Sequence, residues 1–378
     1  NSAMSDHLTL FFTRGVSLRT WSMVGMLDRE IAIYRRLADN GFHVNFVTYG
    51  DASDLAYADK LGPIHILCNE IGMPLEQYES SLLALHGMAL RHRGVIKTNQ
   101  TLGGELALQA ARSLGRSLVA RCGYMWSLNA GREHGEDSSA ATEARRVEEL
   151  VFRSADKVVV TTEAMRLNVK ERMPDVTHRI AVIPNYVDTD LFRPDNSVAS
   201  EPSLVFIGRI APEKNLAALL EAIRPLKVRL TLIGEGKLRP GLQREFADLA
   251  DRVSWEGNVP NTQLPAYVNA GGIFVLLSLY EGHPKALLEA MACGVGVIGA
   301  DSPGIREVIR HKETGYLCGT DPLSIRAAIE DMLSRPEMVR ELGRNARQYV
   351  IENYSLDRIF GLESEDRKST RLNSSHVA

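Results

Sequence analysis

Cysteine is scarce in this chain, and its spacing excludes the sites that cysteine usually builds. Cys68, Cys122, Cys293 and Cys318 are scattered over 378 residues, and no two of them form a C-x-x-C pair. A zinc site or a disulfide scaffold is therefore not expected, and isolated thiols indicate a reducing compartment.

Long apolar runs and an excess of basic residues are also missing. No stretch reaches the roughly 18 consecutive apolar residues of a transmembrane helix, and the first residues lack the apolar core of a signal peptide. The net charge of −3 disfavours a nucleic-acid partner, which usually meets a basic excess. We expect a cytoplasmic protein and leave peripheral contact with the inner face of the membrane open.

What the sequence does contain describes an ordinary globular protein with more than one domain. The chain is 44% apolar and 24% charged, as folded globular domains usually are. At 378 residues, two domains are the default expectation.

Apolar runs typical of buried strands alternate with helical patterns along most of the chain. Strands are predicted at residues 8–13, 44–49, 64–67, 95–97, 117–120, 158–160 and 180–183 in the first half, and at 203–207, 228–233, 253–255, 273–277 and 295–298 in the second. Helices are predicted at residues 23–40, 75–91, 105–114, 141–154, 215–223, 242–249, 264–270, 285–293, 323–334 and 336–352. This alternation predicts a parallel α/β sheet in each half.

Two acidic residues flank the start of the helix predicted at 285–293. Glu281 follows an apolar strand at its C-terminal end, and Glu289 lies about a turn into the helix. Open α/β sheets bind ligands at this edge, and free N–H groups at a helix start favour anions. The N–H groups of Lys285 and Ala286 could serve a phosphate, whereas Pro284 has none to give. We also count the neighbouring His283 and Leu287 as candidate substrate contacts.

A basic loop follows the first strand of the second half. It reads Gly208-Arg209-Ile210-Ala211-Pro212-Glu213-Lys214-Asn215. Arg209 offers a planar fork of donors and Lys214 a compact charge, which together suit a diphosphate. Fixed cations aimed at a departing diphosphate stabilise the transition state more than the ground state. Asn215 is a candidate N-cap for the following helix.

These two motifs, in this order, resemble the G-R-x-x-x-E-K-N and E-x7-E segments of retaining glycosyltransferases of family 4. That family has the GT-B fold, an α/β architecture in which two Rossmann-like, doubly wound parallel-sheet domains face a cleft. The resemblance implies that Arg209 and Lys214 act at the diphosphate beside Gly208, that Glu281 holds donor-sugar hydroxyls and that Glu289 accepts hydrogen bonds from the ribose. It also implies that backbone groups around Val259 meet the nucleobase. The likeness is strong over residues 183–309 and weak before them.

A stretch rich in Pro and Asn, residues 184–202, predicts the linker between the two domains. We expect an N-terminal acceptor-binding domain over 1–190 and a C-terminal nucleotide-sugar domain over 191–353. The resemblance implies that 354–362 crosses back to the first domain. Residues 363–378 are polar and aperiodic and are expected to be a non-native tail, as the first three residues resemble a cloning scar. Asp188 and Asp190 form a D-x-D in the linker, where a metal role is not expected.

The first half carries fewer signals. Gly15 follows the first strand and would let backbone approach the donor phosphate or the acceptor, although the family's paired-glycine loop is absent. Arg14 and Arg19 either bind an anionic acceptor or are solvated. Arg121 and Tyr124 stand where many relatives carry a His near the donor sugar, and the flanks of His134 predict a loop.

The resemblance implies a retaining, metal-independent hexosyltransferase that needs no cofactor. Its donor would be a uridine or guanosine diphosphate sugar, and its acceptor a hydroxyl of a glycan, a lipid-linked sugar or a small molecule, in polysaccharide or glycolipid biosynthesis. Two alternatives stay open: a sugar-nucleotide 2-epimerase of the same fold, and a non-catalytic sugar-nucleotide binding module. A nicotinamide dehydrogenase is not expected, because the G-x-G-x-x-G pattern that begins at Gly234 fails at Arg239. Donor sugar, linkage and oligomeric state are left open.

Overall fold

The chain folds into two compact units in the computed structural model. The structure describes residues 6–92, 94–198 and 201–374, with side chains described as far as Arg367. The first unit contains residues 6–22, Glu30–Pro184 and the chain from Phe360 onward, and the second contains Met23–Arg29 and Asn185–Ile359.

The first unit is built on a parallel sheet. Its seven described strands lie in the order β3-β2-β1-β4-β5-β6-β7. Their bounds are β1 His7–Phe11, β2 His43–Val47, β3 His65–Leu67, β4 Gly94–Thr98, β5 Ser117–Arg121, β6 Lys157–Val160 and β7 Ile180–Val182. Strand β1 pairs with both β2 and β4. The strand order changes direction between β1 and β4, so these two strands form the topological switch point of the sheet.

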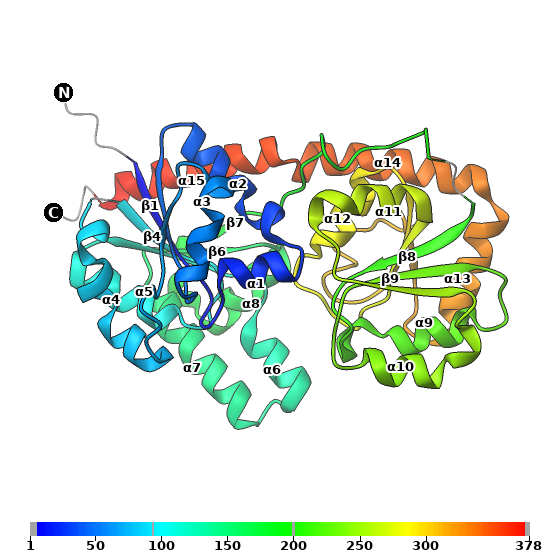
Figure 1. The fold of residues 1–378 in the computed structure, drawn as a ribbon, viewed down its shortest axis with the longest axis horizontal. Coiled ribbons are helices and arrows are strands. Elements are labelled where there is room, and N and C mark those ends of the chain that lie inside the picture. The colour runs from blue at the N-terminus through cyan, green and yellow to red at the C-terminus, as the bar shows by residue number, and fades with distance from the viewer. Residues whose placement is uncertain (1–5, 93, 199–200, 375–378) are drawn as a thin grey trace. The chain divides into compact units, whose positions relative to one another are not determined.

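Helices lie on both faces of this first sheet (Figure 1). They are α1 Leu18–Met23, α2 Leu27–Asp39, η1 Ala52–Tyr57, α3 Ala58–Leu61, α4 Leu75–Leu90, α5 Gly104–Leu114, α6 Trp126–His134, α7 Ser139–Ser154, α8 Glu163–Arg172 and η2 Pro174–Arg179. Their starts follow ordinary capping chemistry. Ser138 Oγ accepts the Ala141 N–H at 3.1 Å ahead of α7, and Thr162 Oγ1 accepts the Met165 N–H at 3.1 Å ahead of α8.

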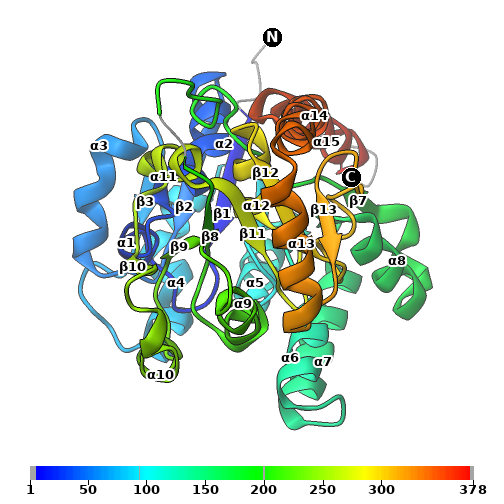
Figure 2. The same ribbon diagram turned by 90° about the vertical axis from the view of Figure 1, so that its right-hand side faces the viewer.

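The second unit repeats the architecture with a six-stranded parallel sheet among the described residues. The order β10-β9-β8-β11-β12-β13 can be followed across Figure 2. The strands are β8 Ser203–Ile207, β9 Arg229–Ile233, β10 Val253–Gly257, β11 Gly272–Leu276, β12 Gly296–Ala300 and β13 Tyr316–Cys318. Here β8 and β11 are neighbours, and they form the switch point of this sheet.

Helices also cover both faces of the second sheet, with α11 and α12 on one face and α9 and α10 on the other (Figure 1). The bounds are η3 Pro212–Lys214, α9 Leu216–Ile223, α10 Arg239–Glu245, η4 Ala247–Leu249, η5 Asn261–Gln263, α11 Leu264–Gly271, α12 Lys285–Ala292, α13 Pro322–Ser334 and α14 Pro336–Tyr354. Helix α15, Leu356–Ser374, begins in this unit and belongs to the first unit from Phe360 onward. Asp321 caps α13 through the Ser324 N–H at 3.0 Å, with Pro322 at the first helical position.

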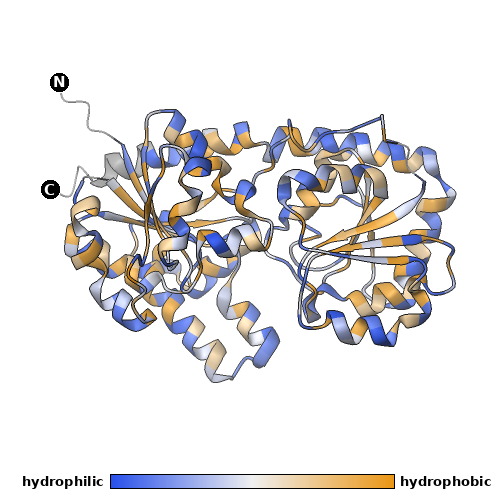
Figure 3. Ribbon diagram, in the orientation of Figure 1, coloured by the Kyte–Doolittle hydropathy of each residue, from blue (hydrophilic) through white to orange (hydrophobic). Residues whose placement is uncertain are grey.

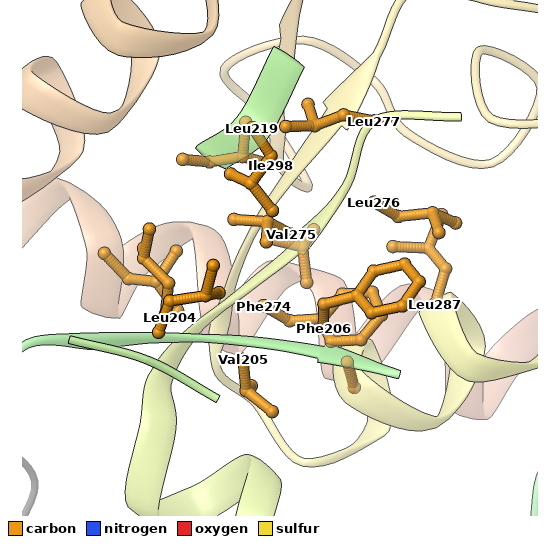
Figure 4. Close-up of a cluster of buried hydrophobic side chains, with 14 of the residues drawn as sticks. Leu204, Val205, Phe206, Leu219, Phe274, Val275, Leu276, Leu277, Leu287 and Ile298 are labelled. Atoms are coloured by element: carbon orange, nitrogen blue, oxygen red, sulfur yellow. The ribbon is translucent and has the colours of Figure 1, made fainter. Parts of the chain in front are cut away.

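The strands of both sheets are largely apolar, as the orange colour in Figure 3 shows. Strands buried on both faces read as near-continuous apolar runs, which is why the sequence predicts them well. In the second unit the core forms between β8, β11 and the helices that cover them, with Phe206 and Phe274 at its centre (Figure 4). Both rings are almost fully buried.

Several expectations about boundaries need correction. The units divide between Pro184 and Asn185, a few residues before the expected boundary at 190. The helix expected at 23–40 is broken, because Gly25 adopts φ +84° and α2 begins only at Leu27. The sequence pattern does not predict strand β13, since its three half-buried residues give too weak a signal.

The expected tail at 363–378 takes part in the fold as far as its side chains are described. Helix α15 continues through this stretch to Ser374. Glu363 is 7% exposed and pairs with Lys97 Nζ at 3.0 Å, and Lys97 itself is 3% exposed. Burial alone would raise the pKa of Glu363, but the nearby charges of Lys97 and Arg367 outweigh it and lower that pKa to about 2. A buried lysine on a central strand needs a partner, and no local pattern indicates which residue that partner is.

This pairing predicts the effect of shortening the chain. Ending it after Leu362 leaves the Lys97 ammonium buried without its carboxylate, which should lower the free energy of unfolding by about 3–5 kcal/mol in urea titrations at neutral pH. Ending it after Arg367 keeps the pair and serves as the control, and Lys97→Met should restore most of the loss in the shorter chain. The stabilisation is complete above the unfolded pKa of about 4.3 and is lost as the pH falls toward about 2. Equal stability of the two shortened chains would contradict this role of Glu363.

Candidate active site

The switch point of the second sheet brings the two predicted motifs together. The loop at 208–215 follows β8, and the loop at 277–284 follows the neighbouring strand β11. The N–H of Leu279 donates to the carbonyl of Glu213 at 2.8 Å, which joins the two loops through their backbones. Beside this bond, Lys214 Nζ lies 2.5 Å from Glu281 Oε1. Residues 67 positions apart thus form one ion pair at the ligand-binding edge.

Glu281 is held by more than the lysine. Ser278 Oγ donates to the same Oε1 atom at 2.7 Å, and Ser302 Oγ donates to the Ser278 carbonyl at 2.7 Å. Both serines are buried. The Glu281 side chain is 14% exposed and that of Lys214 is 16% exposed, so the pair is partly shielded but still reachable. Its geometry is fixed before any ligand arrives.

Gly304 lets the turn after β12 approach the backbone of Glu281 closely. It has φ +88°, and a Cβ at this position would lie 2.4 Å from the Glu281 carbonyl oxygen. The Glu281 N–H donates to the neighbouring Pro303 carbonyl at 2.9 Å. The turn after β12 therefore supports the glutamate through its backbone, and only glycine fits there.

Arg209 is the exposed member of the basic loop. Its guanidinium pairs with Glu213 Oε1 at 3.0 Å, and its side chain is 73% exposed. An exposed pair of this kind contributes little to stability and leaves Arg209 able to turn toward an anion. Lys214 is the fixed charge of the loop and Arg209 the movable one.

Glycines pack the loops after β8 and β9 backbone against backbone. Gly234 has φ +136°, and a Cβ there would lie 1.8 Å from the Gly208 carbonyl oxygen. Gly236 lies as close to the Ile210 carbonyl, with a Cβ separation of 2.1 Å, and the Ile210 N–H donates to Glu235 O at 2.9 Å. These contacts with the loop after β9 fix the path of the basic loop.

Helix α12 begins directly after the Glu281 loop. Lys285, Ala286 and Leu287 form its first turn, and Pro284 at the N-cap provides no side-chain cap. The N–H groups of a first helical turn have no acceptor within the helix, so this start can receive an anion. The Leu287 side chain is fully buried, which limits its contribution to its backbone N–H.

Glu289, predicted to hold the ribose, is buried at 2% exposure and already accepts two hydrogen bonds. Asn261 Nδ2 donates to Oε2 at 2.6 Å, and an Arg29 guanidinium nitrogen lies 2.9 Å from Oε1. Arg29 belongs to the segment Met23–Arg29 of the second unit. Sequence reasoning missed both partners, because they lie 28 and 260 positions away and neither belongs to a recognised motif.

Val259 lies beside the same segment of the second unit. A Cβ on Gly25 would lie 2.3 Å from the Val259 carbonyl oxygen, and the Asn261 N–H donates to Gly25 O at 2.7 Å. The predicted nucleobase loop is thus ordered by backbone contacts, and Gly25 is needed for their close approach.

His283 does not share the surroundings of Glu281. Its ring is 6% exposed, its Nδ1 atom accepts the Asn185 N–H at 3.1 Å, and the ring packs edge-on against Tyr354 with centroids 4.9 Å apart. Its expected contact with substrate stays a prediction, while the observed contacts connect it to the linker.

In the first unit, Gly15 has φ +80° and no atom within 4 Å of its Cβ position, so the loop after β1 is open there. Arg14 pairs with Glu79 at 2.9 Å instead of standing free in solvent, and Arg19 is exposed. Arg121 donates to the Asn99 carbonyl at 3.0 Å across the carboxyl ends of β4 and β5. Arg14 therefore follows β1, whereas Arg121 is the last residue of β5, and the two contact different partners.

Two smaller expectations change, for Asn215 and for His134. Asn215 stands at the start of α9, but it adopts φ +58° and its side chain donates to Thr320 O at 2.8 Å instead of capping the helix. His134 ends α6 and is not in a loop. Asp188 uses Oδ1 to accept the N–H groups of Asp190 and Leu191, as an Asx turn does. Within the described residues, no group of three or more His, Cys, Asp or Glu is arranged to hold a metal ion.

Two of the buried thiols, Cys122 after β5 and Cys293 at the end of α12, have raised pKa values. Burial, with a smaller contribution from Glu289, raises the pKa of Cys293 to about 12. Burial and Glu148 likewise raise the pKa of Cys122 to about 12. Both thiols therefore stay protonated at neutral pH.

Two family models divide the chain between them. The model described as Glycosyltransferase Family 4 matches residues 31–191, and the one described as Glycosyl transferases group 1 matches residues 188–349. The D-inositol 3-phosphate glycosyltransferase of Thermobispora bispora is 28% identical over 365 residues. The match covers 86% of this chain and 85% of that protein.

Two solved structures show the same fold over nearly the whole chain. Sucrose-phosphate synthase from Thermosynechococcus elongatus superposes with a TM-score of 0.83 at 21% identity, covering 97% of this chain and 100% of that one. HepE of Anabaena, in complex with UDP and glucose, gives a TM-score of 0.79 at 18% identity, covering 96% of this chain and 99% of that one.

Two parallel-sheet Rossmann-like units, each with loops at its switch point, have the GT-B fold. The chain belongs to the group 1 glycosyltransferases of family 4. The predicted fold class, family and enzyme class are thereby confirmed, and neither a 2-epimerase nor a binding module gains support from these relatives.

The glycine packing under the basic loop predicts a selective loss of stability. Gly234→Ala should force the loops after β8 and β9 apart and lower the free energy of unfolding by about 2 kcal/mol or more, because both the φ angle and the space exclude a Cβ. Gly241→Ala on α10 is the matched control, since its Cβ meets no atom within 4 Å. Urea unfolding of both variants measures the difference, and an equal effect would contradict the proposed close packing.

Proposed function

We propose that this enzyme transfers a sugar, with retention of anomeric configuration, from a nucleoside diphosphate sugar bound at the switch point of its second unit. The observation that carries the proposal is the Lys214–Glu281 pair beside the start of α12, which has no side-chain cap. A cation and a helix start suit the anionic diphosphate of a sugar nucleotide, and a carboxylate suits the hydroxyl groups of its sugar.

Lys214 and Arg209 supply the charge that the leaving group needs. Breakage of the bond between the anomeric carbon and the phosphate oxygen leaves extra negative charge on the diphosphate. Lys214 is already in place through Glu281 and Ser278, so little reorganisation is required when that charge develops. Arg209, released from its exposed pair with Glu213, adds a planar double donor.

Glu281 and Glu289 then take the two sugars of the donor. Glu281, whose side chain is 14% exposed, binds hydroxyl groups of the transferred sugar. Glu289 binds the ribose, and its present hydrogen bonds to Asn261 and Arg29 mark it as an acceptor with both oxygens in use. Each carboxylate oxygen can accept a second hydrogen bond, so ribose hydroxyl groups can donate to Glu289 alongside Asn261 and Arg29.

Retention follows a route on one face of the sugar. The acceptor oxygen approaches the anomeric carbon on the side from which the diphosphate departs, and the departing phosphate oxygen takes the acceptor's proton. This route needs no protein nucleophile.

The donor nucleotide and the acceptor are proposed only as classes. A uridine or guanosine diphosphate sugar fits, and the Anabaena relative binds UDP. We assign the acceptor to the first unit, near Gly15, as a hydroxyl of a glycan, a lipid-linked sugar or a small molecule. The Thermobispora relative acts on D-inositol 3-phosphate, a small phosphorylated acceptor.

A cytoplasmic location, with transient contact at the inner membrane face for a lipid-linked acceptor, completes the proposal. Its support is the four free cysteines, which suit a reducing compartment. In the described part of the chain, none of the helices has the length and apolarity to cross a membrane.

Removing either partner of the ion pair should nearly abolish transfer. Lys214→Ala and Glu281→Ala should each lower kcat/KM by about two orders of magnitude, the loss expected for one preorganised electrostatic contact. Lys227→Ala and Glu245→Ala, both exposed and away from this edge, are the controls. Near-normal turnover with a donor that the unmodified enzyme uses would refute the role of that residue.

Charge supplied by side chains also predicts behaviour toward chelators. We propose that no divalent metal bridges the diphosphate, so saturating EDTA should change kcat by less than about twofold. Loss of activity in EDTA that Mg²⁺ or Mn²⁺ restores would show that a metal supplies this charge instead.

A further inference from the structure

His283 connects the donor-site loop to the linker by two hydrogen bonds. The Asn185 N–H donates to His283 Nδ1 at 3.1 Å, and Asn185 Nδ2 donates to the His283 carbonyl at 2.8 Å. Both residues are 6% exposed and lie 98 positions apart in the sequence. Asn185 is the first residue of the second unit after the chain leaves the first.

The same ring also contacts the segment through which the chain returns. Tyr354 packs edge-on against His283, and the Tyr354 carbonyl accepts the Val187 N–H at 2.9 Å. The Leu356 N–H donates to Val187 O at 2.9 Å, which pairs the outgoing and returning segments as one short bridge. The chain passes back to the first unit shortly afterwards, after Ile359.

His283 is therefore a junction of three segments in the second unit. It lies two residues after Glu281 and two before Lys285, the first residue of α12. Because its ring is buried and its Nδ1 lone pair is used by Asn185, a shift of this loop has to move the linker or break the bond. Hinges between domains usually consist of a few residues in loops or at the ends of helices and strands, which is where His283 and Asn185 lie.

We infer that His283 is a positioning residue, which couples occupation of the donor site to the linker at Asn185–Val187. This role rests on the proposed donor site. It also replaces the expectation that His283 contacts substrate: the side chain acts through Asn185 and not on the nucleotide. Binding of the diphosphate at Lys214 and the start of α12 draws the loop to a new position, and His283 passes that change to the segments beside two of the connections between the units, at Pro184–Asn185 and Ile359–Phe360.

Two substitutions separate the ring's hydrogen bond from its bulk. His283→Phe keeps a ring against Tyr354 but removes the acceptor for the Asn185 N–H. His283→Asn loses the ring but can place its Oδ1 close to the position of Nδ1 and accept the same bond. His134→Phe is the control, because that side chain is exposed at the end of α6.

Hydrogen–deuterium exchange with and without UDP, and in parallel GDP, tests the coupling directly. In the unmodified enzyme, nucleotide should slow exchange both in residues 281–289 and in 185–187. His283→Phe should keep the first effect and lose the second, and His283→Asn should recover it. In transfer assays, His283→Phe should lower kcat by about tenfold or more with the donor KM changed less than about threefold.

The outcomes distinguish the role of His283 from the function on which it rests. No protection at 281–289 by either nucleotide overturns the proposed donor site, and the role of His283 falls with it. Protection there without any change at 185–187, or the same linker protection in His283→Phe, overturns the role of His283 alone. A large rise in donor KM with unchanged kcat would make His283 a substrate contact after all.

Discussion

The partly buried ion pair between Lys214 and Glu281 is the contact on which the site depends. It joins the loops that leave two adjacent strands, and it fixes a cation at the place that we propose for the anionic leaving group. Removing two charges from water has a cost, which Ser278 and the backbone bonds at the switch point help to offset. The pair is therefore better explained by function than by stability.

Glycine controls how closely the surrounding loops can approach. Gly234 against Gly208, and Gly304 against Glu281, allow backbone contacts that no other residue permits. These contacts let the loop after β9 approach the basic loop, and the turn after β12 approach Glu281, backbone against backbone. The rigid sheet and these close contacts give a site formed in advance, as electrostatic stabilisation of a leaving group requires.

Much of the fold could be predicted from sequence because buried parallel strands are continuous apolar runs, as β8 and β11 are. The placement of Lys214 and Glu281 was also predictable, since each lies in a loop after such a strand and a switch point brings the loops of adjacent strands together. Other features have no local pattern. The partners of Glu289 are distant in sequence, the break at Gly25 depends on a contact with Val259, and Lys97 gives no sign of Glu363. The direction of the His283 ring likewise depends on Asn185, which only the folded chain brings near.

The most direct measurement of the central claim is a crystal structure of the enzyme with UDP or GDP bound. The account predicts that the diphosphate lies within hydrogen-bonding distance of Lys214 Nζ and the first N–H groups of α12, with Arg209 turned toward it and no metal ion between. A diphosphate bound away from Lys214, or bridged to the protein through a divalent cation, would contradict it.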